Sequence, residues 1–442
     1  MSSAEPQPME FAPAGPLTGV ARVPGDKSIS HRALMIAAMA RGRSRIEGLL
    51  TGADVMSTAA ALREMGVVIQ PDGSGAYEVD GLGAGALLEP AVPLDMGNSG
   101  TSARLLMGLV ASHPIAATFT GDASLSRRPM ARVVRPLRRI GAEFLGRSGD
   151  RLPLTIRGAS PALPLVHRME VASAQVKSAL LLAGLNTPGV TEVIEPVPTR
   201  DHSERMLKLF GAPLEAAAGA GGERRIRLTG QAELRPQQLR VPGDISSAAF
   251  LIVAALIVPG SDLRIEDVGV NPLRTGLIDQ LRRMGGNIDL TDAREVGGEP
   301  VAEIRVRHSR LRGIDVPPEA APSMIDEFPI FFIAAAFAEG ATRTSGLAEL
   351  RVKESDRIAA MAEGLRAVGV NAAEQPDGLT IEGSGGAPLP GGGPIDPRLD
   401  HRIAMSFAVA GLHACAAVNV ADMAPVDTSF PGFAQTLESL AS

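Results

Sequence analysis

The sequence repeats one short pattern six times, in which small and polar residues precede an apolar segment. The first and fourth copies are the most alike, because Val-Pro-Gly-Asp occurs at 23–26 and again at 241–244. The copies are spaced 71 to 82 residues apart and are counted from these positions: Asp26, Asn98, Ser173, Asp244, Asp326 and Asp400. Such a period marks a repeated structural unit, so we expect six related modules.

Each module continues with a second, amphipathic helix and several short strands. We expect the second helices at 54–65, 128–140, 200–210, 272–284, 354–368 and 433–440. Five of them stop at a glycine, the residue that most easily ends a helix in the left-handed conformation: Gly66, Gly141, Gly211, Gly285 and Gly369. Strand-like runs fill the gaps at 67–70, 154–157, 224–228, 303–307 and 379–382. The modules are therefore mixed α/β units.

The first helix of each module is apolar nearly all round and belongs inside a domain, whereas the charged face of the second faces solvent. Three modules around three buried parallel helices would form one domain, and six would form two. The likeness of the first and fourth copies places the boundary near residue 240. A solenoid of six stacked repeats is an alternative on periodicity alone.

The composition argues against several classes of partner. The net charge is −6, and the chain has no Trp, one Tyr and 12 Phe, so it lacks both the positive charge and the stacking surfaces that nucleic-acid binders use. The lone Cys415 rules out a disulfide framework and a zinc site built on thiolates, and it fits a reducing compartment. It ends a mostly apolar stretch, so we interpret it as a core residue. We expect a cytoplasmic protein.

No segment of the sequence is a candidate for a membrane span or a targeting signal. The longest unbroken apolar run, 248–258, has eleven residues, whereas a bilayer span needs about 20. The first fifteen residues hold three prolines but no Lys or Arg, so we expect a loose tail there.

The starts of the six apolar helices are candidate anion sites, because backbone N–H groups and the positive end of the helix dipole meet there. Plain N-capping is the alternative, since it explains Ser, Asp and Asn before a helix without any ligand. Basic residues near these starts favour the anion site: Lys27, Arg32, Lys177 and Arg402. Further basic residues precede second helices in three clusters: 127–128, Arg200 and 351–357. We infer a site for small, multiply charged anions.

Taken together, the motifs resemble the 5-enolpyruvylshikimate-3-phosphate synthase family of enolpyruvyl transferases, from about residue 17 to residue 433. Seven segments fall in the family's order and spacing: 25–28 with 31–32, 97–101, 128–130, 173–177, 326–327, 353–357 and 400–402. In addition, Arg-Asp-His-Ser-Glu at 200–204 resembles the pattern of the glyphosate-tolerant class. Each motif alone is weak, but seven in order are specific.

The resemblance implies an α/β fold of two globular domains, each with three βαβαββ units around buried parallel helices, an inside-out α/β barrel. It implies an N-terminal lobe at 23–240 on the shikimate 3-phosphate side. It also implies a discontinuous C-terminal lobe, 1–22 plus 241–442, with the active site in the cleft between the lobes. The implied reaction transfers the enolpyruvyl group of phosphoenolpyruvate to the 5-hydroxyl of shikimate 3-phosphate and releases phosphate. This step belongs to the shikimate pathway to chorismate and aromatic amino acids.

The resemblance also implies the site residues. Shikimate 3-phosphate would be held by Lys27, Ser28, Arg32, Ser173, Ala174, Gln175, Arg200, Asp326 and Lys353. Phosphoenolpyruvate would be held by Lys27, Gly100, Arg128, Gln175, Arg357 and Arg402, with backbone amides near Gly97 assisting. Asp326 matches the family's base, and Glu354 with Lys353 matches the acid, while Lys27 completes the catalytic set. No metal or organic cofactor is implied, because Lys and Arg neutralise the substrates, and we expect a monomer.

Some residues depart from the family patterns. Thr428 replaces a lysine that some members carry, and Leu273 replaces the Thr that is usual in the tolerant class. Gly100 leaves room for glyphosate, whereas the 200–204 pattern is that of tolerant enzymes. Two rival functions remain: a sister transferase that acts on UDP-N-acetylglucosamine through a reactive loop cysteine, and a non-enzymatic repeat scaffold.

Overall fold

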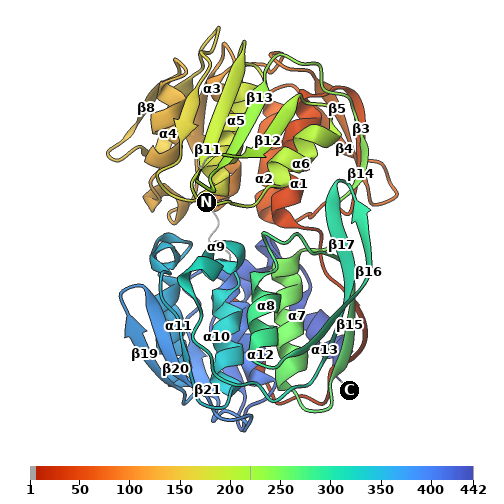
Figure 1. Cartoon of the computed structure of the whole chain (residues 1–442), viewed down its shortest axis with the longest axis vertical. Helices are drawn as coiled ribbons and strands as arrows, with labels where there is room; N and C mark the ends of the chain where they lie inside the picture. The colour runs from red at the N-terminus through yellow and green to blue at the C-terminus, as the bar shows by residue number, and fades with distance from the viewer. Residues whose placement is uncertain (1–5, 220, 442) are drawn as a thin grey trace. The chain divides into compact units, whose positions relative to one another are not determined.

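The computed structural model describes residues 6–219 and 221–441, which divide into two compact units (Figure 1). The N-terminal unit comprises Gly25–Pro242 and the short segment Val296–Glu299. The C-terminal unit comprises the described residues up to Pro24, Gly243–Glu295 and the chain from Pro300 onward. Each unit has its own hydrophobic core, and no residue belongs to both cores. Two separate cores exclude the solenoid alternative.

The segment Val296–Glu299 departs from the boundaries expected from the sequence, which gave it to the C-terminal lobe. The Glu299 carboxylate lies 2.7 Å from His202 Nδ1, and the Gly298 carbonyl accepts a hydrogen bond from Arg205 at 3.2 Å. These contacts join the segment to the N-terminal unit. Gly297-Gly298 has the sequence of an ordinary hairpin turn, so the local sequence does not predict these contacts with the N-terminal unit.

The N-terminal unit contains three modules with the same strand order. Its elements are α1 Lys27–Met39, β3 Arg41–Glu47, α2 Ala53–Glu64, β4 Val68–Pro71, β5 Tyr77–Leu82, β6 Leu94–Asp95, α3 Gly100–Ala111, β7 Ala116–Thr120, η1 Leu125–Arg127, α4 Ala131–Arg138, β8 Glu143–Arg147, β9 Arg151–Arg157, β10 Val166–Arg168, α5 Ala174–Gly184, β11 Val190–Glu195, α6 His202–Leu209, β12 Leu214–Ala218, β13 Arg224–Thr229 and β14 Gln238–Arg240. The sheets run β14-β3-β5-β4, β6-β7-β9-β8 and β10-β11-β13-β12. In each sheet the first two strands are parallel and the other neighbours are antiparallel. This is the expected βαβαββ unit.

The C-terminal unit also has three sheets, one with four strands and two with three, and the start of the chain supplies a strand to two of them. Its elements are β1 Met9–Phe11, β2 Thr18–Arg22, α7 Ile245–Ile257, β15 Asp262–Gly269, α8 Gly276–Arg283, β16 Asn287–Val296, β17 Glu299–Arg307, η2 Pro318–Ala320, α9 Ala321–Met324, α10 Phe328–Phe337, β18 Ala341–Arg343, η3 Ala348–Val352, α11 Arg357–Ala367, β19 Asn371–Gln375, β20 Gly378–Glu382, β21 Gly392–Ile395, α12 His401–Gly411, β22 Val418–Val420, η4 Ala424–Thr428 and α13 Phe433–Leu440. The sheets run β16-β17-β15-β2, β18-β20-β19 and β1-β22-β21.

The N-terminal residues pair with this unit, as the family resemblance implies. Strand β2 lies parallel to β15, and β1 lies antiparallel to β22. The expectation of a loose tail over the first fifteen residues is therefore wrong for Met9–Phe11, and residues 1–5 lie outside the described part of the chain. A short strand on a sheet edge is fixed by its distant partner, which a local pattern does not reveal.

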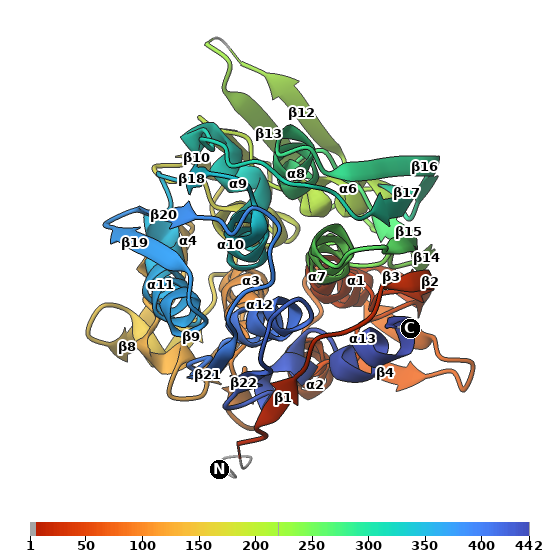
Figure 2. The same ribbon diagram turned by 90° about the horizontal axis from the view of Figure 1, so that it is seen from below.

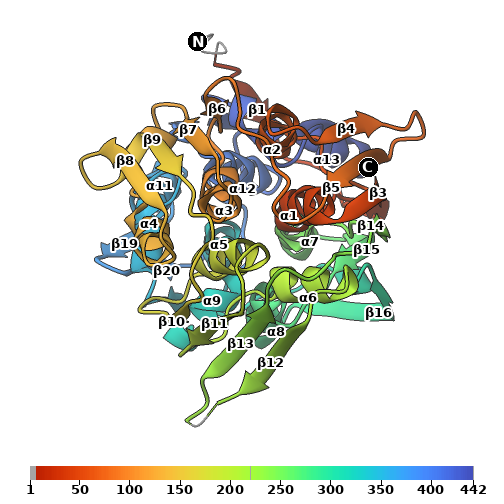
Figure 3. The same ribbon diagram turned by 90° about the horizontal axis from the view of Figure 1, so that it is seen from above.

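The first helix of each module lies in the core of its unit, as its apolar sequence predicts. Every residue of α7 and α10 is buried, and α10 packs against both α7 and α12 (Figure 2). In the N-terminal unit, α3 packs against α1 and α5 (Figure 3). The polar residues of the repeated pattern lie in the loops that precede the buried helices.

The five glycines that were expected to end the second helices all adopt a positive φ, from +85° to +102°. Their neighbours close the helix ends: the amide of Val67 donates to the Leu62 carbonyl at 3.1 Å, and Val370 to Leu365 at 2.9 Å. These bonds satisfy carbonyls that a helix end otherwise leaves without partners.

The starts of several second helices differ from the expected ones. Helix α4 begins at Ala131 instead of residue 128, and α11 begins at Arg357 instead of residue 354. Arg128 is extended, with φ −74° and ψ 131°, because a residue before proline is disfavoured in the helical region. The charged residues before these helices therefore lie in loops.

Within the described chain, a membrane-crossing length of apolar helix is found only by joining two pieces, Pro318–Met324 and Phe328–Phe337, that are bent by 119°, and no single helix reaches it.

Candidate active site

Five of the six buried helices begin with a side chain that caps their first turn. Asp26 accepts a hydrogen bond from the Ile29 amide at 2.8 Å. The other four capping residues are Ser99, Ser173, Asp244 and Asp400. N-capping thus accounts for these polar residues without a ligand. The case for an anion site therefore depends on the cations near the helix starts.

Lys27 is the first residue of α1, where a positive charge opposes the helix dipole. Its ammonium forms an ion pair with Asp54, in the first turn of α2, and only 20% of the Lys27 side chain is exposed. Ser28 follows, half-buried. Asp54 is a functional neighbour that the sequence analysis missed, because the pairing of α1 and α2 starts is a tertiary contact.

Arg32 is a buried guanidinium whose hydrogen bonds go to neutral oxygens. Its Nε donates to Ser203 Oγ at 2.8 Å, its Nη2 to Ser178 Oγ at 2.7 Å and its Nη1 to the Ser28 carbonyl at 2.9 Å. Burial lowers the pKa of Arg32 to about 10, although Asp26 and Glu204 oppose that shift. The side chain is still protonated at neutral pH. A buried cation held by uncharged acceptors is prepared to receive an anion.

Arg200 and the start of α5 lie in the same unit as Arg32. Arg200 is half-buried in the loop before α6, and its charge helps to lower the pKa of Arg32, so the two guanidinium groups interact electrostatically. Ser173 caps α5, and Ala174 is the first residue of that helix. The next residue, Gln175, donates to Thr101 Oγ1 at 3.0 Å and accepts from Arg104 Nη1 at 2.9 Å.

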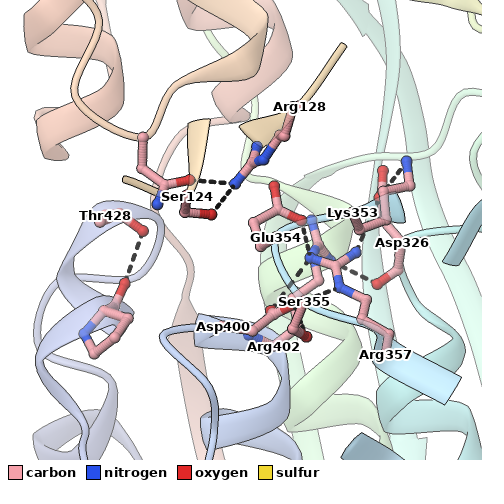
Figure 4. Close-up of polar contacts among 12 residues, drawn as sticks. Ser124, Arg128, Asp326, Lys353, Glu354, Ser355, Arg357, Asp400, Arg402 and Thr428 are labelled. Carbon is pink, nitrogen blue, oxygen red and sulfur yellow. Dashed lines mark hydrogen bonds and ion pairs between the residues drawn. The ribbon is translucent and has the colours of Figure 1, made fainter. Parts of the chain in front are cut away.

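Gly100 begins α3 beside two arginines. Arg128 donates to Asn98 Oδ1 and, at 3.2 Å, to Ser124 Oγ (Figure 4). A Cβ added at Gly100 would lie 2.8 Å from Arg104 Nη1 and 3.3 Å from Arg128 Nη1. Arg104 was not among the expected site residues, although an arginine in the second turn of an apolar helix could have drawn attention to it.

In the C-terminal unit, four of the expected residues form one cluster of ion pairs that includes the carboxylate of Asp326. Asp326 Oδ1 lies 3.4 Å from Lys353 Nζ and 3.4 Å from Arg357 Nη1, and Glu354 Oε2 lies 2.7 Å from Arg357 Nη2 (Figure 4). Asp326 precedes Glu327, the residue at the cap position of α10, which makes no side-chain cap. Plain N-capping, the alternative to an anion site, therefore does not explain Asp326, because Asp326 is not the N-cap of α10.

Arg357 is neutralised within this cluster. Its Nε donates to Asp400 Oδ2 at 2.8 Å, and Ser355 donates to the same oxygen at 3.0 Å. Burial lowers the pKa of Arg357, but the carboxylates of Asp400, Glu354 and Asp326 outweigh burial and raise it above its ordinary value. Asp400 has a second task, because it also caps α12. The sequence indicated the cap but not the ion pair.

Arg402 lies in the first turn of α12 and joins the same cluster. Its Nη1 donates to the Asp326 carbonyl at 2.9 Å and lies 3.7 Å from Glu327 Oε1. The C-terminal unit thus gathers Asp326, Lys353, Glu354, Arg357 and Arg402, and the N-terminal unit holds the remaining expected residues. An acidic group flanked by an ammonium and a guanidinium can accept or pass a proton next to a bound anion.

Two expectations about single residues are wrong. Lys177 does not face an anion site, because its ammonium is fully buried between Glu195 and Glu204. Cys415 is exposed rather than part of the core. Helix α12 ends at Gly411, so Cys415 lies in the turn before β22 and not on the apolar helix that the sequence suggested.

Thr428 is held by its own local structure, since its hydroxyl donates to the Pro425 carbonyl at 2.7 Å within η4 (Figure 4). Nothing in that contact supplies the positive charge of the lysine that some members of the resembled family carry.

Comparison with known proteins gives one consistent answer. The sequence pattern of the family described as EPSP synthase (3-phosphoshikimate 1-carboxyvinyltransferase) matches residues 11–437. A relative from Sphingopyxis alaskensis, named 3-phosphoshikimate 1-carboxyvinyltransferase, is 62% identical over 437 residues, which cover 98% of each chain. A relative of the same name from Novosphingobium aromaticivorans is 61% identical and covers 98% of this chain and 99% of its own.

Solved structures agree. The EPSP synthase of Acinetobacter baumannii superposes with a TM-score of 0.87 at 44% identity, over 98% of each chain. The enolpyruvyl transferase NikO of Streptomyces tendae shares the fold, with a TM-score of 0.77 at 21% identity over 99% of this chain and 98% of its own. The match across residues 11–437, with more than 60% identity to two full-length relatives, shows that this chain belongs to the EPSP synthase family.

Proposed function

We propose that the clusters around Arg32 and around Asp326 are the substrate-binding and catalytic groups of this transferase. The chain is a 3-phosphoshikimate 1-carboxyvinyltransferase. It transfers the enolpyruvyl group of phosphoenolpyruvate to the 5-hydroxyl of shikimate 3-phosphate and releases phosphate, in the shikimate pathway. Its substrates are small anions, and we expect it to act as a monomer in the cytoplasm.

The observation that carries the assignment is the environment of Asp326. Its carboxylate caps no helix and has Lys353 and Arg357 at 3.4 Å. An ionised carboxylate is the form that accepts a proton, and neighbouring cations stabilise that form. In our proposal Asp326 therefore removes the proton from the 5-hydroxyl as that oxygen attacks the central carbon of phosphoenolpyruvate.

A second group must protonate the methylene carbon of phosphoenolpyruvate as the new C–O bond forms. We assign this step to Glu354, assisted by Lys353. Glu354 contacts Arg357 and Lys353 contacts Asp326, so both belong to the same cluster. The product of the two steps is a tetrahedral ketal. Its collapse expels phosphate and removes a proton from the methyl carbon, which restores the C=C bond and forms the enol ether product.

The remaining residues bind the substrates. We assign shikimate 3-phosphate to Lys27, Ser28, Arg32, Ser173, Ala174, Gln175, Arg200, Asp326 and Lys353. We assign phosphoenolpyruvate to Lys27, Gly100, Arg128, Gln175, Arg357 and Arg402. The physical support is that the hydrogen bonds of Arg32 go to neutral oxygens. Arg402 donates to a carbonyl and has the Glu327 carboxylate at 3.7 Å, so each guanidinium can gain a closer anionic partner.

The rival assignment to the sister transferase requires a reactive cysteine near the reacting carbon. Cys415 is exposed, but it follows the C-terminal end of α12, whereas Asp400 and Arg402 lie at the start of that helix. A helix of eleven residues is about 16 Å long, so the thiol lies far from this cluster. The family assignment and this separation both favour the shikimate enzyme.

Replacing Asp326 with alanine tests the assigned base. We expect turnover to fall by about 10²- to 10⁴-fold, because the general base is lost. Shikimate 3-phosphate binding should stay largely intact, because the other residues assigned to this substrate remain. Phosphate release from phosphoenolpyruvate, measured with and without shikimate 3-phosphate, gives the rate, and calorimetry gives the binding constant. Asp315→Ala, at a side chain that is 77% exposed, is the matched control. Near-normal turnover in Asp326→Ala would remove Asp326 as the base.

The substitution Gly100→Ala tests the fit of the phosphoenolpyruvate side. The added Cβ must displace the ends of Arg104 and Arg128. We expect it to weaken inhibition by glyphosate, which is longer than phosphoenolpyruvate, by roughly 10- to 200-fold, the usual effect of one extra methyl group in a tight pocket. The KM for phosphoenolpyruvate serves as the internal control and should change less. Equal changes in both constants would contradict the assignment.

Alkylation of the native protein tests the role of Cys415. Because the thiol is exposed, we expect iodoacetamide to modify it completely, as measured by intact mass. We expect turnover to stay unchanged, as in a Cys415→Ser variant. Loss of activity that tracks the modification in the wild type, and is absent from the serine variant, would restore the sister transferase as the better interpretation.

A further inference from the structure

The ammonium of Lys177 is the most deeply buried cation that the proposed mechanism does not use. Its side chain has no exposed surface, and neither has that of Glu195. The Nζ lies 3.0 Å from Glu195 Oε1, 2.8 Å from Glu204 Oε1 and 3.2 Å from the Thr199 carbonyl oxygen. Burying a charge costs several kcal/mol of desolvation free energy, so a charged lysine at this buried position calls for an explanation.

The three partners of Lys177 come from three parts of one segment. Glu195 ends β11, Thr199 lies in the loop that follows, and Glu204 lies in the first turn of α6. Thr199 also donates its hydroxyl hydrogen to Glu195. One ammonium group on α5 therefore fixes both ends and the middle of the loop between β11 and α6.

Two arginines of the proposed shikimate 3-phosphate site depend on this loop. Arg200 follows Thr199 directly in the sequence. Ser203, which precedes Glu204, accepts the hydrogen bond from Arg32 Nε at 2.8 Å. The charge of Arg200 lowers the pKa of Arg32 and that of Glu204 raises it, so the two arginines repel each other while Glu204 attracts Arg32.

We propose that Lys177 is a positioning residue for Arg200: it ties down the loop that holds Arg200 and Ser203, and so keeps two like-charged guanidinium groups aimed at one anionic substrate. This inference rests on the proposed binding of shikimate 3-phosphate by Arg32 and Arg200. It also gives the Arg-Asp-His-Ser-Glu segment at 200–204 a physical meaning. In that segment Glu204 pairs with Lys177, and His202 is held by Glu299.

The test compares Lys177→Met, which removes the charge but keeps the length, with Arg200→Met and the double variant. Lys208→Met is the matched control, because Lys208 is an exposed lysine on α6, the helix that also carries Glu204. Calorimetry gives the dissociation constant of shikimate 3-phosphate, and steady-state kinetics gives both KM values.

We expect Lys177→Met to raise the dissociation constant about tenfold or more, the effect of losing one well-placed charged hydrogen bond, and to change the KM for phosphoenolpyruvate much less. We also expect Lys177→Met to weaken binding less in the Arg200→Met background than in the wild type, and Lys208→Met to match the wild type.

The outcomes separate the inference from the proposed function. If Arg200→Met leaves shikimate 3-phosphate binding unchanged, the assignment of Arg200 itself fails. If Arg200→Met weakens binding but folded Lys177→Met does not, the inference alone is overturned. Equal weakening of both substrates by Lys177→Met, or full additivity with Arg200→Met, would indicate a merely structural lysine and would also overturn it.

Removing one member of a buried ion pair can unfold a protein, so a second variant keeps the test decisive. Glu204→Gln preserves volume and leaves Lys177 with Glu195 and the Thr199 carbonyl. The inference predicts the same selective weakening of shikimate 3-phosphate binding in this variant, to a smaller degree. Unchanged binding in folded Glu204→Gln would overturn it.

Discussion

The proposed site depends on holding the positive charge of buried guanidinium groups away from water. A buried guanidinium is costly unless partners replace its hydration. The two units meet this constraint in opposite ways. Arg357 is surrounded by carboxylates of Asp400, Glu354 and Asp326, whereas the hydrogen bonds of Arg32 go to two serine hydroxyls and one carbonyl. The first arrangement keeps a carboxylate in place for proton transfer, and the second leaves a cation ready for a substrate anion.

The repeated fold provides the places where such charges can be held. Every module buries one apolar helix in a core. The packing of that helix holds its first turn and the loop before it in place. Side chains of Asp26, Ser99, Ser173, Asp244 and Asp400 satisfy the first amides. Cations can then gather beside them without unfolding the turn. The second helices begin late, which leaves Arg128, Arg200 and Glu354 in loops instead of helices.

The sequence predicted those features that repeat or that follow from local chemistry. Six modules, two sets of buried helices and five glycine helix ends are all visible as patterns, and the structure confirms them. The family resemblance supplied the pairing of the first residues with the C-terminal unit. Asp54 and Asp400 as ion partners escaped prediction, because their contacts join residues far apart in the chain.

The errors have physical causes as well. Cys415 was assigned to the core from an apolar stretch, but the helix ends four residues earlier and leaves the thiol in a turn. Lys177 was counted among the basic residues that favour an anion site because it lies in the first turn of a helix. Its partners Glu195 and Glu204 are contacts that only the tertiary fold reveals. Arg104 was missed because its role depends on the neighbouring Gly100 and Gln175.

The hydrogen bonds of Arg32 go to neutral oxygens, and in the proposed site the substrate supplies its anionic hydrogen-bond partner. A crystal structure of the protein with bound shikimate 3-phosphate tests this most directly. The account predicts a phosphate or carboxylate oxygen of the ligand within hydrogen-bond distance of Arg32 or of Arg200. A ligand bound elsewhere, with Arg32 still held only by Ser28, Ser178 and Ser203, would contradict it.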